Sequence, residues 1–343
     1  KDLLELINVS EATSTNPNNL LAIVYYTRVL IGIHSEIGDK YITRSQEIHN
    51  RNNLLKDAIR TQDMQQMVTS WIQILTNPSF AHSEEILNNT LKIVGQYVSW
   101  MEISLFISPE FINTVFSFLQ NSKLRNTTCE TLIDIISKKM APQNKLELLS
   151  LLNLTEFIGT LNLIEKNKND DDDDDEDVEF MEFVAKLLNQ IGQELLIVLE
   201  NQSGLLEQVN AQLFKLWPAI LGCLNHNYDD VSQNVFPFLQ QFLTLSKKNP
   251  QLYTVDLMST LLNKLILKMR FDDDDDGVLD EDTQAQFLDF RAKLKSFQDT
   301  IALLEPQLYL EAIPVIINES IFETNVDDVN WRKVELGLYQ LNG

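Results

Sequence analysis

Apolar residues recur at the spacing of an α-helix along almost all of this 343-residue chain. Between Val231 and Leu245, for example, apolar side chains follow one another at +4, +3, +1, +3 and +3, which places them on one face of a helix. Glycine and proline, with 10 and 9 residues, are too scarce for the frequent turns of a many-stranded β protein. We therefore expect an all-α fold of long helices with short connections and no strand.

Helix breakers, most of them prolines, separate the apolar stripes. Proline lacks the N–H that a helix interior requires but is tolerated in the first turn, so pairs such as Asn77-Pro78 and Asn249-Pro250 mark helix starts. Stripes and breakers together predict about fifteen helices. They lie near residues 17–38, 43–60, 62–76, 82–102, 109–120, 123–140, 142–151, 178–201, 204–226, 229–247, 252–270, 283–304, 306–321 and 327–341, with a short helix before them.

The net charge of −23 is concentrated in two acidic runs. Residues 170–182 hold ten acidic residues and residues 272–282 hold eight, and neither run contains Lys or Arg. Runs of like charge repel one another and stay solvated, so we expect acidic loops over residues 166–178 and 271–282. Such a loop suits a basic protein surface as its partner. The alternative interpretation is a solvated insertion that only keeps the chain soluble.

Helices that arrive in pairs about every 40–47 residues are typical of HEAT and armadillo repeats. Two segments, Lys123–Ile136 and Asp229–Phe242, begin with charged residues and continue as an apolar stripe, as the inner helix of such a pair does. The alternative is a globular bundle of unrelated amphipathic helices. A single core rarely extends past about 250–300 residues, and no linker composition flanks the acidic runs. We therefore predict an α-solenoid that runs through residues 1–343 as one segment.

The sequence contains no pattern that indicates catalysis, a metal site or a cofactor. The four histidines, which lack the spacing of metal ligands, are His34, His49, His82 and His226. Asp272–Gly277 matches the start of an EF-hand loop, but Thr283 stands where a bidentate glutamate is required. Cys129 and Cys223 lie on apolar stripes, so we expect buried, unreactive thiols and a reducing compartment. We predict that the protein is not an enzyme and needs no cofactor.

Membrane association is not expected either. No uninterrupted apolar run reaches the roughly 18–20 residues of a membrane span. The chain opens with Lys1 and shows no signal-peptide pattern, which we interpret as the start of a segment from a longer protein.

Several blocks, in their order along the chain, resemble the exportin-t family, the karyopherins that carry tRNA out of the nucleus. Residues 97–105 are similar to the family's Trp-Ile-Asp-Ile segment, with Met101 and Glu102 in place of Ile and Asp. Residues 1–89 match more loosely. The remaining blocks are Leu124–Leu146, Ile191–Leu195, Tyr228–Val231, Phe236–Leu239, Lys268–Asp273, Phe287–Lys295 and Trp331–Tyr339.

The resemblance implies a HEAT-repeat superhelix of about seven repeats, as the middle segment of a longer exportin. It implies cooperative binding of tRNA and GTP-bound Ran, contact with nucleoporins, and shuttling between nucleus and cytoplasm through the nuclear pore. We expect a monomer. Two alternatives stay open: a scaffold solenoid that binds only proteins, which the net charge favours, and another karyopherin with protein cargo.

The resemblance also assigns roles to charged residues. Karyopherins use acidic loops against a basic patch of Ran, and we assign this role to Asp272, Asp273, Asp274, Asp275, Asp276, Asp172, Asp173 and Asp174. Clustered basic residues are candidates to neutralise tRNA phosphates: Lys138, Lys139, Lys145, Arg44, Arg51 and Lys56, with Lys40 and Arg60 beside them. The alternative for each is an ordinary solvent-exposed side chain. We expect Arg125 to be an internal structural residue, and Trp100 and Trp331 to lie in the core.

Overall fold

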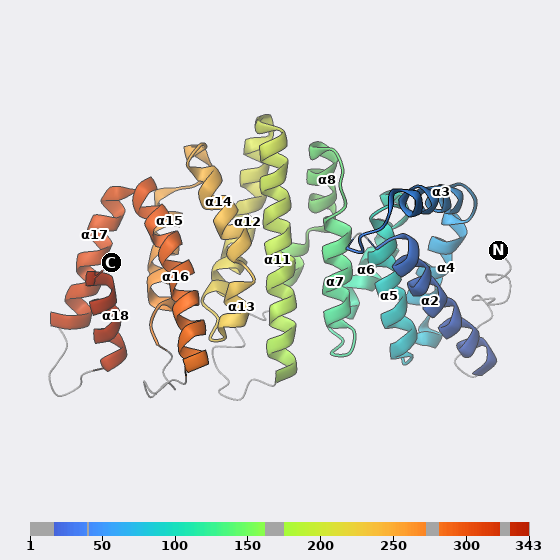
Figure 1. Cartoon of the computed structure of the whole chain (residues 1–343), viewed down its shortest axis with the longest axis horizontal. Coiled ribbons are helices and arrows are strands. Elements are labelled where there is room, and N and C mark those ends of the chain that lie inside the picture. Colours follow the sequence, from blue (N-terminus) through green and yellow to red (C-terminus); the bar gives the residue numbers. More distant parts are fainter. Residues whose placement is uncertain (1–16, 40, 162–174, 272–280, 323–329, 343) are drawn as a thin grey trace. The chain divides into compact units, whose positions relative to one another are not determined.

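The structure is a computed structural model that describes residues 17–39, 41–161, 175–271, 281–322 and 330–342 (Figure 1). Within these ranges the chain forms helices and turns, and no strand occurs. The all-α prediction is confirmed. The helices fit about seven pairs, and they group into two compact units. Whether residues 1–343 behave as one continuous solenoid segment stays a prediction.

Unit 1 contains one row of three helices with further helices packed on it. Helix α5 contacts both α2 and α7, while α4 packs on α5 and α6, as Figure 1 shows for this part of the chain. The elements of this unit are α2 (Pro17–Ile37), α3 (Gln46–Gln62), α4 (Met64–Thr76), η1 (Pro78–Phe80), α5 (Glu84–Val98), η2 (Ile103–Leu105), α6 (Pro109–Phe118), α7 (Arg125–Ile136), α8 (Pro142–Leu152) and the part of α11 (Asp175–Asn201) that ends at Gln190.

Unit 2 is built in the same way from consecutive helices in contact. Helix α16 packs against α14, α15 and α17, and α17 packs against α18. Its elements are α9 (Leu154–Thr160), the part of α11 from Ile191 onward, η3 (Ser203–Leu205), α12 (Leu206–Leu224), α13 (Asp229–Gln233), α14 (Phe236–Ser246), η4 (Pro250–Leu252), α15 (Val255–Lys268), α16 (Glu281–Leu304), α17 (Pro306–Ile317), the π-helical turn η5 (Asn318–Phe322) and α18 (Trp331–Asn342).

Within the described residues the predicted helices agree with the observed ones, with two differences. The short helix expected before residue 17 lies outside the described residues. The helix expected over 229–247 is broken into α13 and α14, and Pro237 lies in the first turn of α14, where its missing N–H needs no intrahelical partner. Helix α9 was not predicted. It follows Asn153, which adopts the left-handed conformation (φ 44°) and turns the chain sharply after α8. Asparagine tolerates this conformation better than other non-glycine residues, so the turn leaves no glycine or proline signal.

An aromatic cluster with internal hydrogen bonds forms the core of unit 1. The rings of Trp71 and Tyr97 meet edge to face at 5.3 Å, and both are fully buried. Their polar atoms have partners: Trp71 Nε1 donates to the hydroxyl of Tyr26 (3.2 Å), and the Tyr97 hydroxyl donates to the carbonyl oxygen of Leu30 (2.7 Å). These bonds fix α2 against α4 and α5.

In unit 2, Trp217 packs against Phe238 (5.3 Å) and Phe242 (4.7 Å). Cys223 lies in this unit and Cys129 in unit 1, both fully buried, and burial raises the pKa of each thiol to about 12. The prediction that both thiols are buried is confirmed, and their lack of reactivity stays a prediction. The prediction that Trp331 lies in the core is wrong: it begins α18 and is 37% exposed, with its ring against Phe271 (5.4 Å) at the surface.

Helix α2 differs from the expectation on membrane spans. Its stretch Leu20–Ile37, with hydropathy 1.3, is long and apolar enough to cross a membrane by length and composition alone. A hydropathy average tolerates the isolated charges of Arg28 and Glu36, whereas an uninterrupted apolar run does not. In the structure α2 packs on α5, and 28% of the stretch is buried. The absence of a membrane partner stays a prediction.

A buried histidine lies between α12 and α13. His226 Nδ1 accepts a hydrogen bond from the Tyr228 N–H (3.2 Å), and its carbonyl oxygen accepts one from Lys268 Nζ (2.6 Å). Lys268 also pairs with Asp229 (2.8 Å). Burial, and then the charge of Lys268, lowers the pKa of His226 from 6.5 to about 4. The imidazole is therefore neutral in the folded protein at neutral pH.

We predict that Gly192→Ala destabilises unit 2. Gly192 lies where α11 approaches α14, and an added methyl group would overlap the buried ring of Phe238. Overpacking of this kind lowers the free energy of unfolding by about 1–3 kcal/mol. The matched control is Gly159→Ala in α9, where an added methyl meets no atom within 4 Å, and where alanine raises the free energy of unfolding by about 0.5–1 kcal/mol. Urea unfolding of both variants measures the difference, and equal effects would contradict this account.

We also predict a pH dependence of stability from His226. Its folded pKa lies below its unfolded pKa, so the unfolded chain binds more protons between pH 6.5 and about 4, and stability falls as the pH is lowered through this range. His226→Asn keeps a hydrogen-bond acceptor but cannot be protonated. From pH 7 to pH 5 the wild type should lose about 1–2 kcal/mol more than this variant. Urea unfolding at both pH values tests this, and parallel losses would refute it.

Candidate functional site

Basic side chains gather where helices α2, α5 and α7 end. A helix C-terminus leaves its last carbonyl groups without intrahelical donors and carries a partial negative charge, so a nearby cation is favourable. Lys138, which follows α7, donates from Nζ to the carbonyl oxygens of Val98 (2.8 Å) and Met101 (2.7 Å) at the end of α5. Lys138 therefore joins two neighbouring helices of the row.

Lys145 does the same for α7. Its side chain is buried, and Nζ donates to the carbonyl oxygens of Ile136 and Lys138. A buried ammonium group is costly unless acceptors surround it, and the end of α7 supplies them. The clustering of basic residues predicts Lys145 on a phosphate-binding surface, whereas the structure places it inside the helix stack as a cap for α7. A tRNA contact by Lys145 stays a prediction, without support from its geometry.

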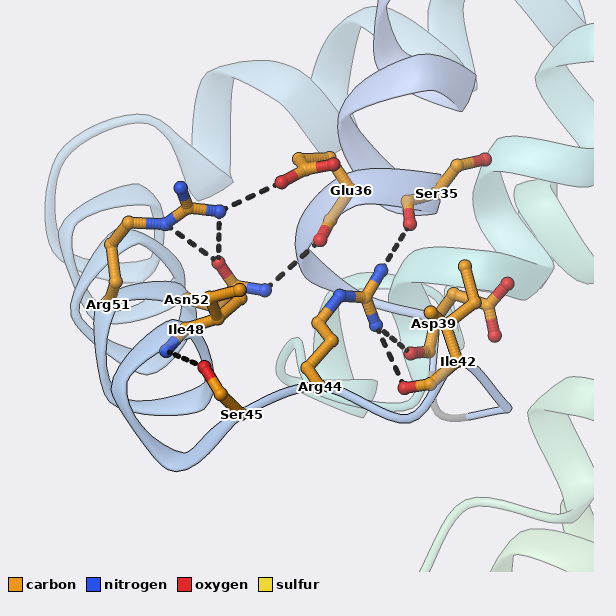
Figure 2. Close-up of polar contacts among 9 residues, drawn as sticks. All are labelled: Ser35, Glu36, Asp39, Ile42, Arg44, Ser45, Ile48, Arg51 and Asn52. Carbon is orange, nitrogen blue, oxygen red and sulfur yellow. Dashed lines mark hydrogen bonds and ion pairs between the residues drawn. The ribbon is translucent and has the colours of Figure 1, made fainter.

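Two more of the predicted residues, Arg44 and Arg51, lie at the junction of α2 and α3 (Figure 2). Arg44 donates to the carbonyl oxygens of Ser35 (2.6 Å) and Asp39 (2.7 Å) and so caps α2. Arg51 lies on α3 and pairs with Glu36 (2.8 Å) near the end of α2. Both guanidinium groups hold the two helices together, and Arg51 keeps 53% of its side chain exposed.

Trp100 lies half-buried beyond the end of α5, with two cations against its ring. Lys56 Nζ is 5.9 Å and Arg60 Cζ 5.7 Å from the ring centroid, which is within cation–π range. Arg60 also donates from Nε to the Trp100 carbonyl oxygen (2.8 Å) and pairs with Asp57. Trp100 is therefore a rim residue, and the prediction that it lies fully in the core is only partly correct.

The cations near these helix ends influence one another. Burial, and then Arg60 and Arg44, lowers the pKa of Lys56, and burial, and then Arg60 and Lys145, lowers the pKa of Lys138. The two groups of basic residues that lie apart in the sequence are therefore close together in space. We call Arg44, Arg51, Lys56, Arg60, Lys138, Lys139 and Lys145 the basic edge.

The predicted phosphate contacts differ in how far their charges reach solvent. Lys139 follows Lys138 and is exposed, and Lys56 is half-buried. Lys40, which belongs to the same predicted group, lies outside the described residues. Because cations can neutralise phosphates without contacting bases, the basic edge suits a ligand with a phosphate backbone. Lys139, Lys56 and the exposed Arg51 are its most accessible predicted members.

The acidic residues predicted to contact Ran lie outside the described part of the chain: Asp172, Asp173, Asp174 and Asp272–Asp276. The end of the first run, from Asp175 onward, is described. Asp177 pairs with Arg125 (2.7 Å), whose guanidinium carbon lies 4.5 Å from the centroid of the Phe180 ring. This confirms the prediction that Arg125 is an internal structural residue.

A second arginine, to which the sequence assigns no role, lies on the helix that follows the other acidic run. Arg291 of α16 is buried and pairs with Glu335 of α18, with both guanidinium Nη atoms donating (2.8 and 2.6 Å). Both residues belong to blocks that carry the family resemblance. Their pairing could not be inferred from spacing, because they are 44 residues apart and on different helices.

Comparisons with known proteins agree with the fold and with the resemblance. A family model described as exportin 1-like protein matches residues 1–132, and the model described as Exportin-T matches residues 203–342. The chain is 99% identical over its full length to Exportin-T of Candida albicans and 57% identical over 95% of its length to Exportin-T of Scheffersomyces stipitis.

The chain spans about a third of the length of these curated relatives, 34% and 31% respectively. A solved structure titled Importin13 cytosolic state covers 99% of this chain with a TM-score of 0.75 at 14% identity, and this chain covers 41% of it. That likeness confirms the HEAT-repeat fold class. The identity over the whole length and the two family models show that the chain belongs to the exportin-T family.

Proposed function

We propose that the longer protein represented by this segment carries tRNA out of the nucleus in a complex with GTP-bound Ran. The observation that carries the proposal is the 99% identity, over every residue of the chain, to a protein named Exportin-T. On this proposal the protein moves between nucleus and cytoplasm through the nuclear pore, contacts nucleoporins on the way, and acts as a monomeric transport receptor and not as an enzyme.

The basic edge is the proposed tRNA surface of unit 1. Lys56, Lys139 and Arg51 contact phosphates, because their charged groups are the more accessible ones. Three further members of the basic edge cap helix ends: Lys138, Lys145 and Arg44. The carbonyl groups that they bond balance their charges only partly, so these residues add positive potential to the same surface. Contacts of this kind recognise the spacing of phosphates in a folded RNA and not its base sequence.

The two acidic runs are the proposed contacts with a basic surface of Ran, through Asp272–Asp276 and Asp172–Asp174. A partner that binds an anionic loop and an RNA that binds a basic edge do not compete for the same charges. Each can favour one curvature of the repeat array, and then each raises the affinity of the other. Weak nearest-neighbour coupling between repeats keeps the free-energy cost of such a change low.

A receptor with protein cargo is the second candidate. The charge of −23 favours it, because a strongly anionic segment repels RNA at long range. The fold also occurs in an importin, so fold alone does not separate the two. The dependence of RNA binding on Ran and on salt does separate them.

We predict that GTP-loaded Ran raises the affinity of the full-length protein for tRNA. The reason is reciprocity: two ligands that favour the same conformation must strengthen each other by the same factor, typically about 5–150-fold. Fluorescence titration of labelled tRNA, with and without GTP-loaded Ran, measures that factor. Equal affinities in the two titrations would exclude the linkage, and undetectable tRNA binding in both would favour the protein-cargo alternative.

We predict that Lys56→Gln combined with Lys139→Gln weakens tRNA binding by the full-length protein. Each phosphate contact removed should lower the slope of log affinity against log salt by about 0.7–0.9. The matched control is Lys247→Gln with Lys248→Gln, which removes the same charge from two exposed lysines of unit 2. A loss of affinity that is equal in the two double variants would assign the effect to net charge and not to the basic edge.

A further inference from the structure

The turn that follows α5, residues 98–101, is bonded by a cation at each of its four carbonyl oxygens. Lys138, which follows α7, bonds three of them, and Arg60 of α3 bonds the fourth, that of Trp100, from Nε (2.8 Å). The three that Lys138 bonds belong to Val98 (2.8 Å), Ser99 (3.3 Å) and Met101 (2.7 Å). Segments on both sides of α5 therefore fix this turn, and Trp100 lies in it.

The core of unit 1 supports the side chain of Trp100. Its ring lies 5.1 Å from the ring of Tyr97, measured between centroids, and the Tyr97 ring meets that of the buried Trp71 at 5.3 Å. Tyr97 is itself fully buried, and its hydroxyl donates to the carbonyl oxygen of Leu30 (2.7 Å). The core therefore determines where the Trp100 ring lies, independently of the cations against it.

Two cations on successive turns of α3 lie over this one ring. Lys56 Nζ is 5.9 Å and Arg60 Cζ 5.7 Å from the centroid of the Trp100 ring. Like charges four residues apart on a helix repel one another, and burial, and then the charges of Arg60 and Arg44, lowers the pKa of Lys56. The negative face of an indole ring attracts both cations and so offsets part of this repulsion.

Little else fixes the second half of α3. In this helix, which the structure describes in full, Asn52 is the only buried residue, and its amide donates to the carbonyl oxygen of Glu36 in α2 (3.0 Å, Figure 2). Among the described residues, the side-chain hydrogen bonds and ring contacts that join the last two turns of α3 to another part of the chain all involve Trp100. The position of Lys56 therefore depends on Trp100.

The indole N–H of Trp100 adds a second observation. Nε1 is buried and has no hydrogen-bond acceptor among the described residues. A buried donor without an acceptor is destabilising, and phenylalanine at this position would avoid that cost. Tryptophan, however, binds cations more strongly through its ring face than phenylalanine or tyrosine does. The ring face, and not the N–H, is therefore what this tryptophan supplies.

We propose that Trp100 is a positioning residue of the tRNA surface: its ring holds Lys56 in the place where that lysine meets a phosphate group. The inference rests on the proposed function, in which Lys56 contacts a phosphate of tRNA. It adds that the affinity of the basic edge depends on an uncharged aromatic residue behind the cations, and not only on their number.

Positioning and charge have different effects on RNA binding. A lysine that is free in solution loses rotamer freedom when it binds a phosphate, whereas a lysine that is already held loses less. Ordering one long side chain corresponds to about a three- to tenfold change in affinity. Because Trp100→Leu removes no charge, the slope of log affinity against log salt should stay at the wild-type value.

The experiment measures the affinity of full-length variants for labelled tRNA by fluorescence titration, with GTP-loaded Ran at a saturating concentration. Trp100→Leu should weaken binding about three- to tenfold with an unchanged salt slope. Trp100→Phe keeps a ring face and should bind within about twofold of the wild type. In a Lys56→Gln background, Trp100→Leu should weaken binding by less than about twofold further, because the side chain that it holds is absent.

Trp331→Leu is the matched control. Trp331 is also partly exposed, at 37%, and also has a cation over its ring, Arg332 with Cζ at 4.9 Å, but it lies in unit 2. This substitution removes the same kind of ring and the same kind of cation contact without touching the basic edge. It should leave the affinity for tRNA unchanged.

The outcomes separate the inference from the proposed function. If Lys56→Gln weakens binding while Trp100→Leu binds as the wild type does, Trp100 has no positioning role and the proposed tRNA surface stands. If neither variant weakens binding, Lys56 is not a phosphate contact and both proposals fail. The inference is also wrong if Trp100→Leu weakens binding by the same factor with and without Lys56, if Trp100→Phe is as weak as Trp100→Leu, or if Trp331→Leu has an equal effect.

Discussion

Helices leave carbonyl groups without intrahelical donors at their ends, and at several ends in this structure basic side chains from other segments bond to them. Lys138 caps α5, Lys145 caps α7, Arg44 caps α2 and Arg291 caps α15. Lys268 bonds to the carbonyl oxygen of residue 226 just beyond α12 in the same way. These bonds satisfy acceptors that would be costly to bury and tie neighbouring helices together, so the register of the helices depends on them.

The same bonds determine where positive charge lies. A cation that caps a helix must sit at a helix end, so the capping residues of α2, α5 and α7 collect at one place in unit 1. The negative charge is concentrated in the two acidic runs, of which residues 170–174 and 272–280 lie outside the described part of the chain. The net charge therefore says little about any single surface, and a segment with a charge of −23 can still carry a basic one.

Helix boundaries and the core followed from the sequence because both depend on local pattern. The break before Pro237 was missed because the apolar spacing continues across it. The turn at Asn153 was missed because it contains no glycine or proline. The role of Arg125 was foreseen from its place at the start of a helix, and that of Lys145 was not. Spacing shows that a lysine lies near a helix end but not which carbonyl groups it meets, because those belong to residues that only the fold brings close.

Lys138 and Lys139 are adjacent in the chain but differ chemically. The ammonium group of Lys138 is enclosed by carbonyl oxygens, while the side chain of Lys139 is exposed to solvent. An acylating reagent would therefore modify Lys139 in the folded protein and Lys138 mainly when the end of α5 opens. Acetylation at Lys138 would remove the charge and two of the three N–H donors of its ammonium group. Acetylation at Lys139 would therefore change only a surface charge, whereas acetylation at Lys138 would report that α5 and α7 had separated.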